Sequence, residues 1–452
     1  MIEHLTILII GRGGREDALT QAYVHSPQVR KVIVAPGNDF IKYKYRHLKE
    51  VITDINCNLS DPNSIFALAQ SYRPDIVDLA CDDPLGVGAA DILRVHDFLT
   101  MGPNKSAARI ESDKKWAKMF LKRERVPTPG FQYFTTDDIS FADEYVKQIY
   151  GEDVSKLLFV KGTGLCAGKG VYRAENIVEA RRAITLMPDL PNDAGKEFLI
   201  EEGLIGEEFS YFVMTDGENF KTFGSAQDNK RIGDFDTGDY TGGMGGNSPA
   251  WATLGYEEVV ENQIIKPVIN GLRNLGHPYQ GILYLGGIIT EEEKPYVIEF
   301  NARWGDPEAQ LILPGIRSDY VDLVKAINEG KVSQVYLKQD SLVRVGVVGA
   351  SRGYPGDYSG VVSHPPKKVY GLEEAIQLRG IDVFGAGIIR AGGKFYANGG
   401  RLFTIVGVGE DISQARQRAY EGMSNMFVEG NNLNYRHDIA WRDLERYFKS
   451  KQ

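Results

Sequence analysis

Short apolar runs alternate with stretches of helical character through the first hundred residues, and this alternation constrains the fold more than any other feature. Residues 5–10 form a continuous apolar run that ends in glycines, and residues 31–35 form a second run closed by a Pro-Gly turn. A helix candidate at 61–72 follows, and then a third apolar run at 74–80. Apolar strands separated by helices are typical of a parallel sheet with right-handed crossovers. We therefore expect residues 1–103 to form a Rossmann-like domain.

The pattern becomes mixed beyond residue 103. One long helix is predicted over 106–125, because two prolines shortly after it end the helical pattern. Strand patterns and glycine-rich stretches follow, and the pattern restarts near residue 345. We expect an α/β and α+β multidomain protein with a second domain at 104–337, which carries a mobile lid lobe at about 126–193. A small C-terminal domain is expected at 338–452.

Composition excludes several classes of protein. The chain of 452 residues is 42% hydrophobic and 25% charged, which rules out a mainly disordered chain, a coiled coil or a collagen-like fibre. Its net charge of -9 argues against nucleic-acid and membrane-surface partners. Cys57, Cys81 and Cys166 form no CxxC pair, and no apolar stretch approaches the roughly 20 residues that span a bilayer. We therefore expect a cytoplasmic protein.

A glycine-rich turn follows the first apolar run at residues 11–15 (GRGGR). Backbone N–H groups at such a strand-to-helix turn bind anions with the help of the helix dipole. Arg12 and Arg15 add positive charge, which favours a phosphate. The turn matches a dinucleotide fingerprint imperfectly, because Asp17 and Ala18 stand near the third glycine position. Taken alone, it fits a phosphosugar site, a dinucleotide site, or a turn that only packs a strand on a helix.

Lysines and acidic groups further along the chain come in an order that suits triphosphate chemistry. Lys118 and Lys161 precede a predicted strand that ends in paired glutamates. Glu299 and Asn301 lie two residues apart on another predicted strand, so both point to one face. Mg²⁺ accepts one or two protein oxygens and completes its shell with phosphates and water. Each piece alone also fits a surface lysine, a solvated acid pair or an ordinary strand end, but their order predicts a magnesium–triphosphate site.

Several specific motifs resemble those of one family and run in that family's order over nearly the whole chain. The chain resembles the ATP-grasp ligases, and within them the phosphoribosylamine–glycine ligase family. The matching segments include GRGGREDAL (11–19), VAPGN (34–38), VKGTGLCAGKGV (160–171), SAQDNKRIGDFDTGDYTGGMGGNSPA (225–250), VIEFNARWGDPEAQ (297–310) and YRHDIAWR (435–442).

The resemblance implies an ATP-grasp fold between a Rossmann-like N-terminal domain and a small C-terminal domain. It also implies a ligase that joins glycine to 5-phosphoribosylamine through a glycyl phosphate, with ATP and Mg²⁺ or Mn²⁺. The products are glycinamide ribonucleotide, ADP and phosphate, in purine biosynthesis. We expect these small molecules as partners, no nucleic acid or membrane, and a monomer or weak homodimer.

The resemblance also assigns roles to residues. Metal ligands are implied at Glu299 and Asn301, and catalytic positions at Arg303, Lys230, Asp234 and Asp236, the two aspartates within the stretch that surrounds glycine. Contacts with the ATP phosphates are implied at Lys118 and Lys161, and a mobile loop over the phosphates at Gly164, Gly168, Lys169 and Gly170. Further nucleotide contacts are implied at Glu201, Glu202 and Glu208, of which Glu201 and Glu208 lie at the adenine and ribose edge. Substrate contacts are implied at Gly13, Gly14, Asn38, Asp82, Thr241, Gly242 and Gly243.

The sequence departs from the family's usual motifs at several positions. Asp17 stands where the family usually has His, and Cys81-Asp82-Asp83 replaces Pro-Glu-Ala. Both departures are expected on the side of the amine substrate, so a ligase of the same family with another amine or acid stays an alternative. Two further alternatives are a nicotinamide-linked oxidoreductase, which lacks an acidic residue after its second strand, and a nucleotide-binding regulator without turnover.

Overall fold

The computed structural model describes residues 4–164 and 170–452. Its N-terminal part is a five-stranded parallel sheet in the order β3-β2-β1-β4-β5, which confirms the predicted Rossmann-like arrangement. The central strands are fully buried because helices cover the sheet. The strands are β1 (Leu5–Gly11), β2 (Val29–Pro36), β3 (Glu50–Thr53), β4 (Ile76–Leu79) and β5 (Thr100–Met101), and the helices are α1 (Gly14–Val24), α2 (Asp39–Tyr45), α3 (Pro62–Tyr72), α4 (Asp82–Val87) and α5 (Ala89–Val95).

The predicted single helix over 106–125 is wrong, because the structure has two helices there: α6 (Lys105–Ser112) and α7 (Lys114–Arg123). The break falls at Asp113, whose backbone is non-helical at φ -133° and ψ 88°. Its side chain accepts a hydrogen bond from the backbone N–H of Trp116 at 2.9 Å and so caps the second helix. The capping aspartate gives α7 an independent direction.

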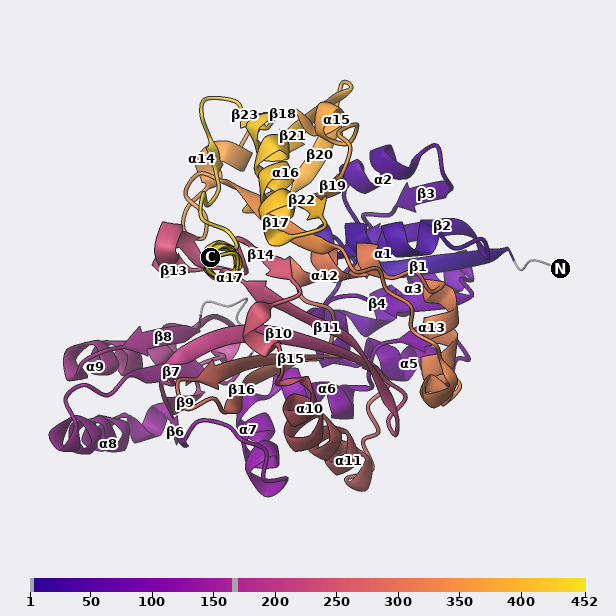
Figure 1. Cartoon of the computed structure of the whole chain (residues 1–452). Coiled ribbons are helices and arrows are strands. Elements are labelled where there is room, and N and C mark those ends of the chain that lie inside the picture. Colours follow the sequence, from indigo (N-terminus) through magenta and orange to yellow (C-terminus); the bar gives the residue numbers. More distant parts are fainter. Residues whose placement is uncertain (1–3, 165–169) are drawn as a thin grey trace.

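A nine-stranded sheet forms the centre of the molecule, with the path β16-β15-β10-β11-β14-β17-β22-β19 and β24 paired to β17. It includes strands from both sides of residue 338, so one sheet joins the middle of the chain to its C-terminal part (Figure 1). The strands are β10 (Gly206–Thr215), β11 (Phe220–Asp228), β14 (Gly245–Ser248), β15 (Gly281–Thr290), β16 (Pro295–Asn301), β17 (Val343–Ser351), β19 (Ile381–Gly385), β22 (Arg401–Gly409) and β24 (Leu433–Asn434). The short hairpin β12 (Arg231–Gly233) and β13 (Thr237–Tyr240) follows β11, and the helices of this part are α10 (Glu257–Val260), α11 (Lys266–Asn274), α12 (Glu308–Ile312) and α13 (Tyr320–Asn328).

A separate four-stranded antiparallel sheet, in the order β6-β9-β7-β8, carries two helices and projects from the rest of the chain (Figure 1). Its elements are β6 (Phe131–Thr135), α8 (Ile139–Glu152), β7 (Leu158–Gly162), β8 (Val171–Ala174), α9 (Ile177–Leu186) and β9 (Glu197–Glu202). This lobe has a hydrophobic core of its own. It therefore packs as a unit beside the central sheet.

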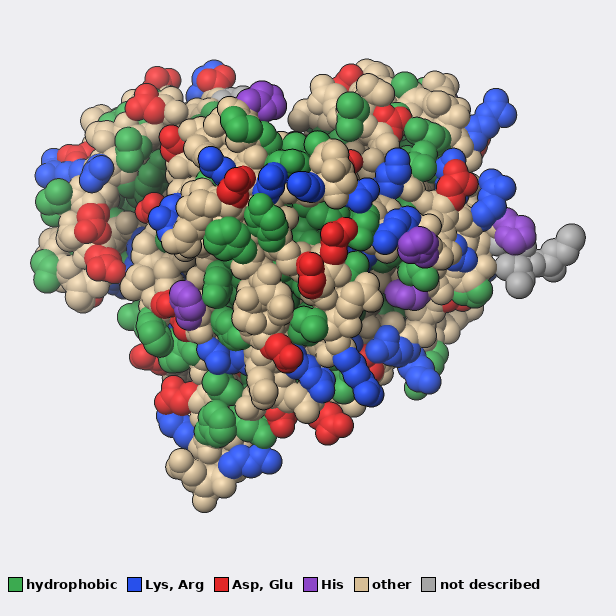
Figure 2. All heavy atoms as spheres, turned by 90° about the horizontal axis from the view of Figure 1, so that it is seen from above, with side chains coloured by type: hydrophobic (Ala, Val, Ile, Leu, Met, Phe, Trp, Pro, Cys, Tyr) green, Lys and Arg blue, Asp and Glu red, His purple; other side chains and the backbone are tan. Residues whose placement is uncertain are grey.

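The C-terminal part adds a small sheet, β20-β21-β18-β23, to the end of the central sheet. Its elements are α14 (Ser359–Val362), β18 (Lys368–Tyr370), α15 (Leu372–Ala375), β20 (Ile388–Ala391), β21 (Lys394–Ala397), α16 (Ile412–Ser424), β23 (Phe427–Val428) and α17 (Trp441–Ser450). No helix in the described part of the chain is long and apolar enough to cross a bilayer. On the face in Figure 2, acidic and basic side chains are interspersed.

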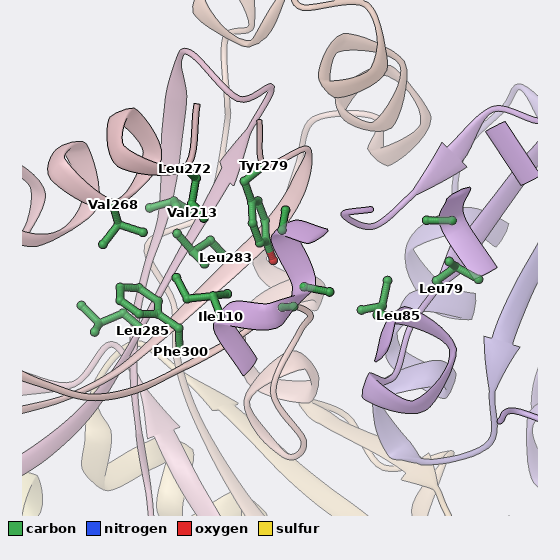
Figure 3. Packing of buried hydrophobic residues seen from close by; sticks show 14 of the residues in the cluster. Leu79, Leu85, Ile110, Val213, Val268, Leu272, Tyr279, Leu283, Leu285 and Phe300 are labelled. Carbon is green, nitrogen blue, oxygen red and sulfur yellow. The ribbon is translucent and has the colours of Figure 1, made fainter. Parts of the chain in front are cut away.

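One hydrophobic core joins the N-terminal domain to the central sheet. Ile110 of α6 lies among Val213, Leu283 and Phe300 of the sheet, and Leu79 and its neighbours extend the same cluster into the parallel sheet (Figure 3). Burying one side chain of this size contributes about 1.5–3 kcal/mol relative to leaving it exposed. The shared core fixes α6 and α7 against the sheet, and these two helices form one wall of the cavity described next.

Candidate active site

A cavity of about 450 Å³ lies where α6 and α7, the lobe strands β7 and β9, and the central strands β10, β11, β15 and β16 converge. Most of the sequence-predicted site residues line it. These are Asp82, Lys118, Lys161, Glu201, Glu202, Glu208, Lys230, Thr241, Gly242, Glu299, Asn301 and Arg303. Segments more than 180 residues apart in the chain therefore meet around one space.

Lys118 and Lys161 share one carboxylate inside this cavity. The Nζ atom of Lys118 lies 2.9 Å from Oε2 of Glu201, and that of Lys161 lies 2.7 Å from Oε1. All three residues are at least nine-tenths buried. Burial acts to raise the pKa of Glu201, but the two lysines outweigh it and hold the pKa below its usual value. Burial lowers the pKa of Lys118.

Two cations and one carboxylate leave the Lys118–Glu201–Lys161 triad with a surplus positive charge in a poorly solvated place. Thr128 accepts a further hydrogen bond from Lys118 Nζ at 2.7 Å, which fixes its direction. A surplus of this kind attracts an anion, because buried charge is costly unless it is paired. The structure thus places Glu201 as the partner of the two lysines.

Glu299, Asn301 and Arg303 project from the end of β16 on the other side of the cavity. Glu299 pairs in register with Gly286 of β15, where a Cβ would come within 3.2 Å of the Glu299 side chain. Arg303 donates to Asn301 Oδ1 at 2.9 Å and lies 2.8 Å from Oε1 of Glu111. Glu111 also accepts the backbone N–H of Ala302 at 2.8 Å. This buried acid fixes the turn that carries Arg303.

The residues present fit a magnesium ion that arrives with a nucleotide. Burial acts to raise the pKa of Glu299, but Lys230, Lys114 and Lys161 outweigh it and keep the pKa below its usual value, so this oxygen donor is ionised. Asn301 is 7% exposed, and its Oδ1 atom accepts one hydrogen bond from Arg303 at 2.9 Å, which leaves its second lone pair for a cation. No group of three or more His, Cys, Asp or Glu in the described ranges could hold a metal ion. Two protein oxygens suit Mg²⁺ completed by phosphates and water.

Lys230 belongs to a second charged group, at the edge formed by β10 and β11. Its Nζ lies 3.3 Å from Oε2 of Glu208. Burial acts to lower the pKa of Lys230, but Glu208 and the other acids around it raise it well above its usual value. Asp228, two residues earlier, has a pKa raised by burial and by nearby Glu308. Lys230 is therefore a fixed cation in this cavity.

Sequence reasoning did not single out several residues that line the cavity. Asp306, Glu308 and Asp228 lie within motifs quoted above, so their signal was available. Arg401 comes from the C-terminal part and donates to the backbone oxygens of Gly242 and Asp306 at 2.8 and 2.6 Å. No sequence signal pointed to Arg401, because only the central sheet brings β22 next to the loop after β13.

The glycine turn at residues 11–15 lies beside the cavity, and two of its backbone N–H groups donate hydrogen bonds to acidic side chains. Gly13 N–H donates to Oε2 of Glu16, and Arg15 N–H lies 3.4 Å from Oδ2 of Asp306. The side chain of Asn38 donates to Arg12 O at 2.9 Å and to Gly385 O at 3.0 Å. Gly14 packs closely against α12, because a Cβ there would meet Gln310 Nε2 at 2.4 Å. Gly13, Gly14 and Asn38 thus lie at the turn rather than among the residues that line the cavity.

The loop predicted to cover the phosphates falls partly outside the described residues, since Gly168 and Lys169 belong to 165–169. Its two ends are described. Gly164 N–H donates to Ala194 O at 3.1 Å, and Gly170 O accepts from Gly162 N–H at 2.9 Å. These contacts fix both ends of the loop next to Lys161.

Thr241, Gly242 and Gly243 form a tight turn after β13. Thr241 Oγ1 donates to Lys230 O at 2.9 Å and accepts from Gly243 N–H at 3.0 Å. Gly243 has a φ of +114°, which favours glycine, and a Cβ there would lie 2.8 Å from Asp228 Oδ1. The turn therefore links Lys230 and Asp228 to the cavity wall.

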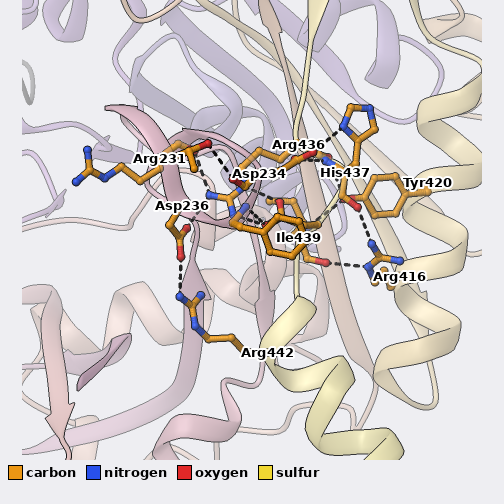
Figure 4. A network of polar contacts seen from close by, with 12 residues as sticks. Arg231, Asp234, Asp236, Arg416, Tyr420, Arg436, His437, Ile439 and Arg442 are labelled. Carbon is orange, nitrogen blue, oxygen red and sulfur yellow. Dashed lines mark hydrogen bonds and ion pairs between the residues drawn. The ribbon is translucent and has the colours of Figure 1, made fainter. Parts of the chain in front are cut away.

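Asp234 and Asp236 lie on the same hairpin but are not among the residues that line the cavity. Asp234 accepts the backbone N–H of His437 at 2.7 Å, and Asp236 accepts from Arg436 at 2.8 Å and from Arg442 at 2.6 Å (Figure 4). Both carboxylates face the C-terminal segment. The structure thus separates them from Arg303 and Lys230, with which the sequence had grouped them.

Asp17, the first departure from the family's motifs, is fully buried away from the cavity. Its carboxylate accepts from Tyr45 Oη and Gly385 N–H, both at 2.7 Å, and lies 3.1 Å from Lys44 Nζ. It joins the N-terminal domain to β19. The hydrogen bonds of Asp17 are therefore with the domain junction, and its expected place on the amine-substrate side stays a prediction.

Comparison with known proteins agrees with this architecture. Sequence models of the N, ATP-grasp (A) and C domains of phosphoribosylglycinamide synthetase match residues 5–111, 112–309 and 344–442. The phosphoribosylamine–glycine ligase of Vibrio parahaemolyticus is 36% identical over 447 residues, which cover 98% of this chain and 99% of that protein. The chain belongs to the phosphoribosylamine–glycine ligase family.

Other members of the phosphoribosylamine–glycine ligase family give the same picture. The Escherichia coli K12 ligase is also 36% identical over 447 residues, or 98% of this chain and 99% of its own length. The crystal structure of the Thermotoga maritima ligase superimposes with a TM-score of 0.75 at 26% identity, over 96% of this chain and 100% of that one. The family resemblance and the ATP-grasp fold predicted from the motifs are thereby confirmed.

Proposed function

We propose that this chain is an ATP-dependent ligase that joins glycine to 5-phosphoribosylamine in purine biosynthesis. One observation carries the proposal: Lys161 and Glu299, 138 positions apart in the sequence, line the same cavity in a member of this family. A nucleotide's phosphates would lie between them. The products are glycinamide ribonucleotide, ADP and phosphate.

In the first step, a carboxylate oxygen of glycine attacks the γ-phosphorus of ATP, and the bond from that phosphorus to the bridging oxygen of ADP breaks. Two anions approach each other, so the site must spread negative charge. Lys118 and Lys161 hold the phosphates with the surplus charge of their triad. One cation about 4 Å from a phosphate oxygen contributes on the order of 4 kcal/mol at an effective dielectric constant of 20.

Glu299 and Asn301 would hold Mg²⁺ or Mn²⁺, which supplies charge neutralisation at the phosphates when bound. Arg303, fixed by Glu111, and Lys230, fixed by Glu208, steady the substrate carboxylate and the oxygen that develops negative charge. The loop that includes Gly164, Gly168, Lys169 and Gly170 closes over the phosphates in this proposal, and Glu202 and Glu208 lie on the nucleotide side.

In the second step, the amine of phosphoribosylamine attacks the carbonyl carbon of glycyl phosphate and phosphate leaves. In this proposal Asp82 and the turn with Gly13, Gly14 and Asn38 are on the side of phosphoribosylamine. Thr241–Gly243 is on the glycine side, and Asp234 and Asp236 support that side through the hairpin that carries them. A monomer or weak homodimer and a cytoplasmic location stay predictions.

A ligase of the same family that acts on a different amine or acid is the second candidate. Asp17 binds the domain junction, and of the three replaced residues 81–83 only Asp82 lines the cavity, where it keeps the acid of the family motif. The change at residue 82 therefore keeps a carboxylate in the cavity wall. An oxidoreductase is not supported, since the chain matches the ligase family over 98% of its length.

An ADP-release assay with glycine alone, amine alone and both substrates tests the proposal. We expect sustained ADP release only with both, its loss on metal chelation, and recovery with Mg²⁺ or Mn²⁺. Glu299→Gln should abolish the metal-dependent rate and keep the fold. ADP release with other amines in preference to phosphoribosylamine would favour the altered ligase, and nucleotide binding without turnover would favour a regulator.

A further inference from the structure

The C-terminal segment 434–446 contacts the outer side of the strands and hairpin whose inner side lines the cavity. Arg436 is fully buried and donates to Asp438 through Nε at 2.8 Å and Nη2 at 2.6 Å. It also donates to Asp236 at 2.8 Å and to Arg231 O at 3.2 Å. Asp438 accepts the backbone N–H of Phe235 at 2.6 Å. Figure 4 shows these residues converging on the hairpin β12–β13.

The same segment binds the central sheet further along, directly at β10 and β14 and through Glu207 at β11. Arg446 pairs with both carboxylate oxygens of Glu207 on β10. Gln227 of β11 donates to the same Glu207 at 2.7 Å. Asp443, which is fully buried, accepts from Asn247 Nδ2 at 2.7 Å and from Trp251 N–H at 3.0 Å. Charged hydrogen bonds thus run from the end of the chain to β10, β11 and β14.

Three of the residues that this segment holds, two directly and Gln227 through Glu207, lie next to a residue that lines the cavity. Glu207 precedes Glu208, Gln227 precedes Asp228, and Arg231 follows Lys230. Successive side chains on a strand point to opposite faces, so fixing Glu207 and Gln227 from outside fixes the direction of Glu208 and Asp228 inside. The segment acts on the cavity wall without touching the cavity.

We infer that residues 434–446 form a C-terminal brace that positions Glu208, Asp228 and Lys230, with Arg436, Arg442 and Arg446 as positioning residues. Arg442 and Arg446 lie at its accessible edge, where their side chains are 31% and 40% exposed. The brace leaves the Lys118–Glu201–Lys161 triad independent, because that triad lies on α7, β7 and β9. The inference rests on the proposed function only for its activity measurement.

The test uses Arg442→Ala, Arg446→Ala and the double variant in the full chain. We expect kcat to fall about tenfold for each single variant and further for the pair, the size of effect that residues away from the ligands exert on a site. The Kd for inorganic tripolyphosphate should stay within about twofold of wild type, because the Lys118–Glu201–Lys161 triad is undisturbed. Arg446→Lys should restore part of the rate, since it keeps the charge and one contact.

Arg317→Ala is the matched control. Arg317 is also a half-exposed arginine that pairs with a mostly buried carboxylate, Asp340, but neither residue lines the cavity. It should lower stability as much as Arg446→Ala does and leave kcat unchanged. The inference is overturned if the brace variants lose no more activity than this control, or if they lose tripolyphosphate binding to the same extent as activity.

Hydrogen–deuterium exchange gives a readout that does not depend on turnover. Backbone amides at 227–231 and 240–243 should exchange faster in Arg442→Ala and Arg446→Ala, while those of β7 and β9 stay unchanged. Exchange that rises equally in all these strands, or in none, would contradict the brace. If the wild-type enzyme shows no ligase activity, the proposed function fails, and this measurement still decides on the brace.

Discussion

The cavity and the C-terminal brace both contain buried cations, but their charges are arranged in opposite ways. In the Lys118–Glu201–Lys161 triad, two ammonium groups share one carboxylate. In the brace, Arg436 and Arg442 meet two carboxylates, Asp236 and Asp438. The first cluster keeps a surplus charge and the second is balanced.

This difference in net charge indicates which of the two clusters binds a ligand. A surplus positive charge in a buried place lowers its free energy by taking an anion, whereas a balanced network with satisfied hydrogen bonds gains nothing from one. The triad is therefore expected to govern ATP binding and turnover, and the brace to govern geometry and stability. Four predictions test this division.

The largest expected effect is a loss of activity when a lysine of the triad is replaced. Lys161→Ala removes a cation that contributes on the order of 4 kcal/mol to holding phosphate, which corresponds to a loss of about a thousandfold in kcat/KM for ATP. Lys147→Ala is the matched control, because this lysine lies on α8 of the same lobe and pairs with Asp143 at 2.9 Å, and neither residue lines the cavity. Steady-state ADP release measures both. A loss of less than tenfold in Lys161→Ala would contradict the role of the triad.

The next largest effect is a loss of unfolding free energy when a buried ion pair of the brace is broken. Asp438→Ala leaves the fully buried guanidinium of Arg436 without its bidentate partner, which costs about 3–5 kcal/mol of unfolding free energy. Urea unfolding monitored by circular dichroism measures this loss. The Kd for inorganic tripolyphosphate, measured on the folded variant, should stay near wild type. Equal loss of stability in Lys161→Ala would remove the distinction between the two clusters.

Acid should affect the brace in a definite direction. Burial acts to raise the pKa of Asp236, but hydrogen bonds from Arg436 and Arg442 outweigh it and hold the folded-state pKa below the usual 3.8. Its stabilising contribution is therefore present above about pH 4 and is lost as the pH falls through the lowered pKa. Asp236→Asn should be less stable than wild type at pH 7, and the difference should shrink toward pH 2. A difference that stays constant with pH would contradict this.

The smallest expected effect is a decline in nucleotide affinity at alkaline pH, through the triad. The pKa of Lys118 is lowered by burial, so this lysine loses its proton below the usual 10.5 as the pH rises. Affinity for an ATP analogue should then decline in the alkaline range, because a neutral amine no longer attracts phosphate. Lys118→Arg should bind with a flatter pH profile, since arginine stays charged. Calorimetric titrations at pH 7.5 and 9.5 measure the difference.

Much of the site could be predicted from short stretches of sequence. The spacing of Glu299 and Asn301 follows from strand periodicity, and the alternation of strands and helices in the first hundred residues predicted the parallel sheet. The single helix over 106–125 failed, because a local cap at Asp113 decides the break and the apolar pattern runs through it. Arg401 was missed since its contacts depend on the position of β22.

The sequence by itself determined the fold class, the family, and the order of the lysines and acids, because these depend on local periodicity and on motifs. Only the tertiary structure decided which partner each charge has. Glu201 binds two lysines from other elements, Asp17 holds a domain junction, and Asp234 and Asp236 face the end of the chain. The physical reason is that ion pairs form between groups brought close by packing, whatever their separation in the sequence.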